Sequence, residues 1–281
     1  MNYDYLIPFV KRWVAGKTLE EAVNVAKYAN SKGYFVVLNY LGEELTDARE
    51  IRFTVFEYRR IIDNITKEKL NAAIALKPTQ IGLCIGEDVF AENLADIISY
   101  AKKNGITVWI DMERSFYLNS TIKVYLDFLK EYEDLGVAIQ AYMRNGLELA
   151  KMIVEQNGFI RLVKGAYKEP ESIVFTNKEE IRENYRKIMN YIFEKRARLE
   201  LATHDEKLVY DAIRLVLKTK HNIEFAFLRG IRNDLKRWLA KEGMRVVEYI
   251  PYGPSWRDYV YRRIREKRSN ILLALTSVFT K

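Results

Sequence analysis

The chain has 281 residues, of which 49% are apolar and 13% aromatic, and this is enough to bury a substantial hydrophobic core. Lys and Arg outnumber Asp and Glu by 46 to 38, and the net charge of +8 favours acidic partners without specifying one. A lone cysteine, Cys84, excludes an internal disulfide and a cysteine-based metal site. The longest apolar tract, at 271–279, is shorter than the ~20 residues that span a bilayer, so we expect a cytoplasmic protein that is neither secreted nor integral to a membrane.

The first predicted helix covers residues 18–32, TLEEAVNVAKYANSK. Thr18 and Glu21 have the spacing of a capping box, apolar residues follow at helical spacing, and Gly33 is suited to end the helix. The preceding Gly-Lys-Thr resembles part of a phosphate-binding loop. Such a loop requires an upstream glycine where this chain has Lys11, so we favour the helix cap.

Eight short apolar runs follow, each typical of a buried strand. They cover residues 35–41, 72–76, 106–112, 136–142, 159–167, 199–203, 223–228 and 245–252. Amphipathic segments long enough for helices cover residues 47–70, 87–104, 120–132, 147–156, 178–196, 206–218, 232–242 and 256–267. The five prolines all lie outside the interiors of these predicted helices, in agreement with the division.

The alternation of strands and helices indicates parallel βαβ units, and near-continuous apolar strands indicate that both faces of the sheet are covered. Eight such units in about 250 residues favour an α/β fold of the (β/α)8 barrel type over an open sheet. We predict a single structural domain with an N-terminal helical cap at 1–34 and a barrel at 35–281. The last helix is expected at the mouth of the barrel.

The active site of such a barrel lies at the carboxyl ends of the strands. These ends are polar here, with Lys77 after the second run, Asp111 and Glu113 after the third, Gln140 in the fourth, Arg161, Lys164 and Tyr167 in the fifth, Thr203, His204 and Asp205 after the sixth, and Tyr249 in the eighth. Any one of them alone is most often a solvated strand end. Their convergence on one rim predicts a functional site.

The stretch 158–167, GFIRLVKGAY, places two cations, Arg161 and Lys164, in a strand pattern. Because a buried strand does not tolerate uncompensated charge, we interpret the two cations as part of a site for an anionic cofactor. The small residues that follow Lys164 let a phosphate approach backbone N–H groups closely.

The segment 202–205, ATHD, adds a hydroxyl, an imidazole and a carboxylate where a helix is predicted to start. His204 is one of two histidines, and a role as a hydrogen-bond partner of the cofactor is favoured over a role as general base. No G-x-G-x-x-G motif occurs, so a Rossmann dinucleotide domain is not indicated.

The segment 256–268, WRDYVYRRIREKR, carries a pair of arginines on its predicted helix. Arg262 and Arg263 lie about 100° apart around the helix, with Tyr259 one turn before them and Glu266 one turn after them. Paired guanidinium groups suit a substrate carboxylate. A basic solvated face or a nucleic-acid patch is the alternative for this segment taken alone.

A series of motifs extends almost from end to end of the chain: WVAGKTLEEA, LNYLGEE, LKPTQIGL, IDME, GVAIQAY, IRLVKGAYKEP, ATHD, EFAFLRGIR and YIPYGPSWRDYVYRRIREKRSN. In these motifs and their order the sequence resembles the proline dehydrogenase family. Members of this family are FAD-dependent (β/α)8 enzymes that oxidise L-proline to Δ1-pyrroline-5-carboxylate. IRLVKGAY and the tyrosine-to-arginine-pair segment are the most specific of the motifs.

The resemblance implies roles for individual residues. The implied cofactor-binding residues are Asp111, Gln140, Arg161, Val163, Lys164, Gly165, Ala166, Tyr167, Thr203 and His204, with Arg161 near the flavin N5 and Gln140 against the isoalloxazine ring. The implied substrate-binding residues are Lys77, Leu228, Tyr249, Tyr259, Arg262, Arg263 and Glu266; Arg262 and Arg263 grip the carboxylate, and Lys77 engages Asp111 or the carboxylate. The implied catalytic residues are Arg161, Lys77, Asp111 and Tyr249, with no metal.

The resemblance also implies FAD ahead of FMN, hydride transfer to the flavin, and the first step of proline catabolism to glutamate. It implies a quinone or a partner redox protein as electron acceptor and no nucleic-acid partner, and it leaves peripheral membrane contact and oligomerisation open. The sequence departs from the family pattern at Ala226, Arg229 and Asn39, and at Asp205, where asparagine is common. Two alternatives remain: a Schiff-base lyase or aldolase that uses Lys164, and a basic nucleic-acid-binding protein.

Overall fold

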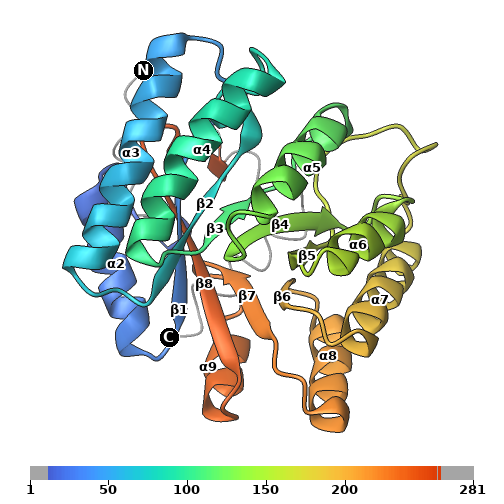
Figure 1. The fold of residues 1–281 in the computed structure, drawn as a ribbon. Helices are drawn as coiled ribbons and strands as arrows, with labels where there is room; N and C mark the ends of the chain where they lie inside the picture. The colour runs from blue at the N-terminus through green and yellow to red at the C-terminus, as the bar shows by residue number, and fades with distance from the viewer. Residues whose placement is uncertain (1–11, 258, 261–281) are drawn as a thin grey trace.

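The computed structural model describes residues 12–257, 259 and 260. Within them, eight parallel strands close a barrel in sequence order, and the last strand is hydrogen-bonded to the first (Figure 1). Helices cover the outside of the barrel (Figure 1). The predicted (β/α)8 architecture is therefore confirmed.

The elements follow the predicted alternation closely. The strands are β1 (Phe35–Tyr40), β2 (Ala72–Leu76), β3 (Val108–Ile110), β4 (Leu135–Gln140), β5 (Phe159–Val163), β6 (Leu199–Ala202), β7 (Glu224–Leu228) and β8 (Arg245–Tyr252). The helices are α2 (Leu19–Ser31), α3 (Ala48–Lys67), α4 (Glu87–Asn104), α5 (Ser115–Leu129), α6 (Gly146–Glu155), α7 (Lys178–Glu194), α8 (Glu206–Thr219) and α9 (Asn233–Lys241), with a 3₁₀ turn η2 (Pro78–Gln80) after β2. The predicted helix at 256–267 lies mostly outside the described residues.

Two predicted boundaries differ from the structure by more than the rest. Strand β5 ends at Val163 instead of residue 167, because the chain leaves the barrel wall at Lys164. Helix α5 begins at Ser115 instead of residue 120. The backbone N–H and the hydroxyl of Ser115 donate to the Glu169 carboxylate at 2.7 and 2.6 Å. That carboxylate comes from a loop 54 residues further on, so the local pattern did not reveal this helix start.

Helix α2 has the capping box that its sequence predicts, with Thr18 accepting from Glu21 and the Glu21 carboxylate accepting from Thr18. It packs on β1, β8 and α3. The described part of the predicted N-terminal cap therefore covers the outer face of the first and last strands (Figure 1). Its buried residues belong to the same apolar cluster as the barrel helices.

The interior of the barrel is packed by side chains that alternate along the strands with those facing the helices. It contains Val37, Ala73, Ala75, Trp109, Phe159, Ala226 and Val247. Trp109 is large enough to need small neighbours: a Cβ added at Gly136, its register partner on β4, would lie 2.4 Å from the indole. The small residues thus make room inside the barrel for Trp109 and for Arg161, whose guanidinium group stacks on the indole.

Candidate active site

Arg161 lies inside the barrel, on the inward face of β5, and is 3% exposed. Its Nη1 donates to Asp111 Oδ1 at 2.9 Å, its Nε donates to Glu200 Oε1 at 2.5 Å, and its guanidinium carbon lies 4.2 Å from the centre of the Trp109 ring. Burial lowers the pKa of Arg161, but the two carboxylates outweigh burial and leave the pKa raised. The Arg161 side chain is therefore permanently charged, and Asp111 and Glu200 balance its charge.

This compensation corrects one sequence interpretation. The buried charge of Arg161 does not require a bound anion, because Asp111 after β3 and Glu200 on β6 balance it. The carboxylates come from positions 50 and 39 residues away in the chain, and closure of the barrel brings them together.

Tyr249 connects β8 to the same cluster. Its hydroxyl donates to Asp111 Oδ2 at 2.6 Å, and its ring faces the Arg161 guanidinium at 5.4 Å. Burial and the nearby Asp111 carboxylate raise the pKa of Tyr249 well above its ordinary value, so the phenol stays protonated and remains a donor. Three of the predicted catalytic residues, Asp111, Arg161 and Tyr249, thus form one hydrogen-bonded network.

Lys77, the fourth predicted catalytic residue, forms an ion pair with Glu43 from the loop after β1. The resemblance implies Asp111 or a substrate carboxylate as the partner of Lys77, and the sequence pattern does not point to Glu43. Both side chains are partly exposed at the carboxyl ends of β1 and β2, so this pair lies at the rim of the barrel.

A second buried group joins Glu113, Thr79 and Gln140. The Glu113 carboxylate accepts from the Thr79 backbone N–H at 2.9 Å and from its hydroxyl at 2.7 Å, and Gln140 Nε2 donates to the Glu113 backbone carbonyl at 2.8 Å. Burial raises the pKa of Glu113 despite the nearby Lys77 ammonium. Glu113 therefore fixes the β2 and β3 ends to each other.

Among the buried polar atoms that have no hydrogen-bond partner within the described residues are Arg161 Nη2, a donor, and Gln140 Oε1, an acceptor. They belong to adjacent strands, β5 and β4, on inward-facing positions. Because leaving buried polar atoms unpaired costs about 1–3 kcal/mol each, such atoms suggest a ligand that carries both an acceptor and a donor.

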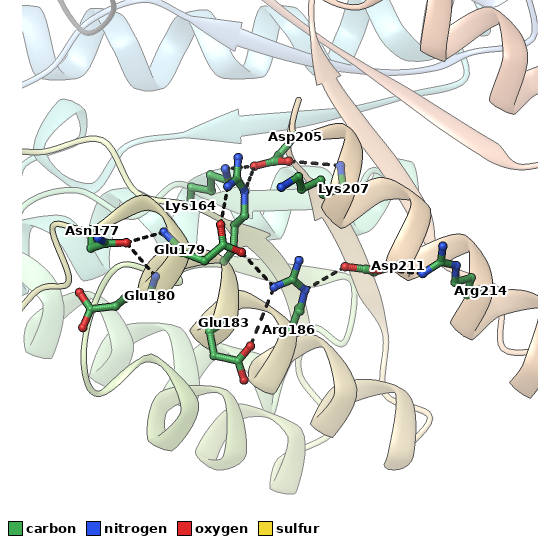
Figure 2. Close-up of polar contacts among 11 residues, drawn as sticks. Lys164, Asn177, Glu179, Glu180, Glu183, Arg186, Asp205, Lys207, Asp211 and Arg214 are labelled. Carbon is green, nitrogen blue, oxygen red and sulfur yellow. Dashed lines mark hydrogen bonds and ion pairs between the residues drawn. The ribbon is translucent and has the colours of Figure 1, made fainter.

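The loop after β5 contains a separate ionic junction (Figure 2). Lys164 and Arg182, from α7, both bind Asp205 Oδ2, the latter at 2.7 Å. Asp205 Oδ1 also accepts from the Lys207 backbone N–H at 3.2 Å and so caps α8. Burial raises the pKa of Asp205, but hydrogen bonds from Lys164 and Arg182 outweigh it and lower the pKa to about 2.

This junction disfavours the Schiff-base alternative, because Lys164 is held as an ammonium donor to a carboxylate and not in an apolar pocket that favours a neutral amine. Arg182 was not expected from the sequence. The network continues along α7 through Glu179 to Arg186, which binds Asp211 of α8 at 2.9 Å (Figure 2).

Gly165 has a structural reason to be glycine. Its φ is +98°, and an added Cβ would lie 2.1 Å from the Tyr142 ring. The small residue after Lys164 therefore permits close packing of the turn on Tyr142, in addition to any approach of a phosphate. Val163 ends β5 beside Gln140, and Ala166 and Tyr167 follow in the exposed or half-buried turn.

His204 connects the ends of β6 and β7: its Nε2 accepts the Leu228 backbone N–H at 3.1 Å. An accepting Nε2 is unprotonated, which places the proton of a neutral ring on Nδ1 and leaves that nitrogen as a donor. Thr203, which is buried, accepts from the Asp205 backbone N–H at 3.2 Å. These contacts fit the favoured role of His204 as a hydrogen-bond partner better than a role as general base.

The predicted carboxylate clamp is only partly described. Arg262, Arg263 and Glu266 lie outside the described residues. Tyr259 is 9% exposed and packs with Val14, Leu41, Trp256 and Val260.

The residue that the sequence argument missed most clearly is Glu200. A glutamate at the centre of LELA, an otherwise apolar strand pattern, is a signal of the same kind as Arg161 in FIRLV. Reading the two together would have suggested an internal ion pair.

A closed parallel barrel with an ion-paired arginine among polar side chains at its carboxyl ends is the architecture of the (β/α)8 barrel enzymes. The proline dehydrogenase family model matches residues 22–272. Proline dehydrogenase 1 of Bacillus subtilis strain 168 is 34% identical over 276 residues, which cover 96% of this chain and 91% of that protein. The chain belongs to the proline dehydrogenase family.

Two further comparisons agree. Proline dehydrogenase of Deinococcus radiodurans is 30% identical over 268 residues, covering 92% of this chain and 86% of that protein. The crystal structure of proline utilization A from Bdellovibrio bacteriovorus superposes with a TM-score of 0.86 over 94% of this chain at 22% identity, which shows a shared fold. The chain spans about a third of the length of that structure, 33%.

Among the described residues, no helix combines the length and the apolar character that a membrane span needs. In the same part of the chain, no group of three or more histidine, cysteine, aspartate or glutamate side chains is arranged to hold a metal ion.

Proposed function

We propose that this protein is a proline dehydrogenase that uses FAD to oxidise L-proline to Δ1-pyrroline-5-carboxylate, the first step of proline catabolism to glutamate. The observation that carries the proposal is the network of Arg161, Asp111 and Tyr249 inside the barrel of a chain that belongs to this family. The network offers a permanent cation, Arg161, and a protonated phenol, Tyr249, inside the barrel.

The described residues fit a flavin. The pyrimidine edge of an isoalloxazine ring carries both acceptors and a donor, which matches the two unpaired atoms Arg161 Nη2 and Gln140 Oε1. Lys164 stands at the start of the glycine-containing turn after β5, where the family resemblance puts the phosphates of the cofactor, so we propose FAD ahead of FMN. The residues proposed to hold it are Asp111, Gln140, Arg161, Val163, Lys164, Gly165, Ala166, Tyr167, Thr203 and His204.

When bound, the flavin supplies the two-electron acceptor for the hydride. Arg262 and Arg263 bind the proline carboxylate in this proposal, with Glu266 holding their guanidinium groups. Lys77, Leu228, Tyr249 and Tyr259 complete the pocket and exclude water. Arg161 keeps a fixed positive charge beside the position where negative charge develops during hydride transfer, and its stacking on Trp109 keeps it oriented.

The proline amine must lose its proton before hydride leaves the adjacent carbon. Tyr249 is protonated at neutral pH, and His204 Nε2 is engaged with Leu228, so neither is a suitable base. We propose that water accepts this proton. The electrons pass on to a quinone or a partner redox protein.

An absorption spectrum of the purified protein tests the proposal directly. We expect flavin absorbance that is bleached when L-proline is added without oxygen and restored by an electron acceptor. D-proline and L-alanine serve as controls that leave the spectrum unchanged. A protein that remains colourless after incubation with FAD, or whose flavin is not reduced by L-proline, would refute the proposed function.

A further inference from the structure

A second acidic residue lies beside Glu200 inside the barrel. Glu200 on β6 and Glu224 on β7 are register partners on adjacent parallel strands, and both alternate with residues that face the helices. The Glu200 side chain is fully buried, and that of Glu224 is 14% exposed. Glu224 also binds Arg245, the first residue of β8, at 3.1 Å, and this arginine is exposed at the amino-terminal end of the barrel.

These groups form a chain of charges through the barrel, from Asp111 and Arg161 through Glu200 and Glu224 to Arg245. If all were ionised, three carboxylates would face two guanidinium groups, leaving one unbalanced negative charge in the interior. One proton on the chain of carboxylates restores the balance, with two negative charges against two positive charges. A balanced interior avoids the large cost of burying an unpaired charge.

The hydrogen bonds show where that proton belongs. Glu200 Oε1 accepts from Arg161, whereas Glu200 Oε2 is buried and has no partner among the described residues. A protonated Glu224 carboxyl is a donor and would satisfy this oxygen. Asp111 already has donors on both oxygens, from Arg161 and Tyr249, and is not the site that needs the proton.

We propose that Glu200 and Glu224 share one proton at neutral pH, and that this pair is the support that holds Arg161 in position for the cofactor. Glu224 is then a positioning residue that acts on Arg161 through Glu200. The shared proton follows from the charges and contacts above, whereas its effect on the cofactor rests on the proposed function.

The electrostatics of Glu224 agree with this arrangement. Burial first and the adjacent Glu200 carboxylate second raise the pKa of Glu224 to about 7, although Arg245 and Arg161 act in the opposite direction. Within the described part of the barrel, the charged groups that act on Glu224 are Glu200 and Arg245, on the neighbouring strands β6 and β8, and Arg161 on β5. Arg198, just before β6, is bound to Asp134 at 2.8 Å.

The proton exchanges with solvent at the amino-terminal end of the barrel, where Arg245 is exposed, and no other bond changes. Above a pH of about 7, Glu224 becomes a carboxylate beside Glu200, and the interior gains one negative charge. That charge repels Glu200 and weakens the positive field of Arg161, so an anionic cofactor at the rim binds less tightly.

Infrared spectroscopy of the protein without substrate tests the shared proton. We expect the carbonyl band of a protonated carboxylic acid at about pH 6, its loss by about pH 8.5, and no such change in Glu224→Gln. Glu242→Gln, which removes an exposed carboxylate at the end of α9, is the matched control and keeps the band. No band in the unsubstituted protein at about pH 6, or the same pH-dependent band in Glu224→Gln, overturns the shared proton.

Two measurements keep the test decisive. If Glu224→Gln does not fold, the infrared titration of the unsubstituted protein decides. Glu200→Gln must then shift the midpoint of the carboxylic-acid band to lower pH, because it removes the like charge beside Glu224.

For the positioning role, FAD titrations should show a Kd that rises about five- to tenfold between about pH 6 and 8.5 in the unsubstituted protein and stays level in Glu224→Gln. An equal rise in both overturns that role. Absence of FAD binding defeats the proposed function and leaves the infrared result standing.

Discussion

At the scale of single residues, Arg161 organises the site because its charge is balanced by partners that the chain supplies from other strands. Asp111 and Glu200 hold the guanidinium from two sides, and Trp109 supports its face. A cation fixed in this way needs no reorganisation when negative charge appears beside it, which is the condition for strong electrostatic stabilisation. The sequence pointed to Arg161 but offered a bound anion as its reason.

Tyr249 is expected to act on the reaction through Asp111. In Tyr249→Phe the Asp111 carboxylate loses a donor at 2.6 Å and is freer to shift away from Arg161. A hydrogen bond to a charged group contributes about 1.5–3 kcal/mol, so kcat/KM for proline should fall about 10- to 100-fold with flavin content unchanged. Steady-state kinetics with an artificial acceptor measure this.

Tyr210→Phe is the matched control, since Tyr210 lies on α8 and is 42% exposed. Its kcat/KM should equal that of the unsubstituted protein. A Tyr249→Phe variant whose kcat/KM stays within about twofold would show that the hydroxyl does not serve the reaction.

At the scale of elements, Asp205 joins three parts of the chain. It caps α8 and binds Lys164 in the loop after β5 (Figure 2). It also binds Arg182 of α7. The family pattern commonly has asparagine at this position, which could cap the helix but could not compensate two cations. Asp205 therefore forms the ion pair with Arg182 that asparagine could not form. It also orders the loop after β5, whose backbone is proposed to face the cofactor phosphates.

The ion pairs of Asp205 make a prediction about pH. Its pKa is lowered to about 2 in the folded protein, below its ordinary value of 3.8, so its contribution to the free energy of unfolding is complete above about pH 4 and is lost as the pH falls from about 4 to 2. After allowance for solvent screening, we expect about 1–2 kcal/mol.

Urea unfolding at several pH values checks this. Asp205→Asn should be less stable than the unsubstituted protein at pH 7 by that amount, and the two curves should converge toward pH 2. Asp134→Asn, which removes a carboxylate from an exposed pair with Arg198, serves as the control and should change stability by less than about 1 kcal/mol. If the free energies of unfolding of Asp205→Asn and the unsubstituted protein differ by the same amount at every pH, the ion pairs of Asp205 do not contribute the expected stability.

Element bounds were predictable where the signal is local. β2 has the predicted limits because polar residues, Asn71 and Lys77, bound its apolar run, β8 has them because Gly243 and Gly253 flank it, and α2 begins where its capping box places it. α5 was misplaced because its first N–H is satisfied by Glu169, and β5 was drawn too long because KGAY is apolar enough to continue a strand. For α5 the deciding interaction, that of Ser115 with Glu169, joins distant parts of the chain.

At the scale of the whole molecule, α2 packs on the barrel and shares its apolar core. It covers the outer face of β1 and β8, and Ala22 and Ala26 are fully buried in the cluster shared with the other helices. Without it, the strands at which the barrel closes would expose apolar side chains to water.

A chain that starts at residue 35 should therefore fail to fold cooperatively. We expect no sigmoidal urea transition in circular dichroism and no FAD binding, because closure of β8 on β1 loses its apolar cover. A chain of 35–281 that unfolds at the same urea concentration as the chain of 1–281 would show instead that the N-terminal segment is an independent cap.

The sequence by itself determined the alternation of strands and helices, and hence the barrel, because hydrophobic periodicity and turn residues are local properties. It also determined which strand ends carry polar side chains, and its motifs indicated the family. Only the tertiary structure decided that Arg161 is neutralised by Asp111 and Glu200, that Lys77 binds Glu43, and that Glu224 lies beside Glu200. The reason is that these pairings depend on strand register and on closure of the barrel, which bring together residues from separate strands.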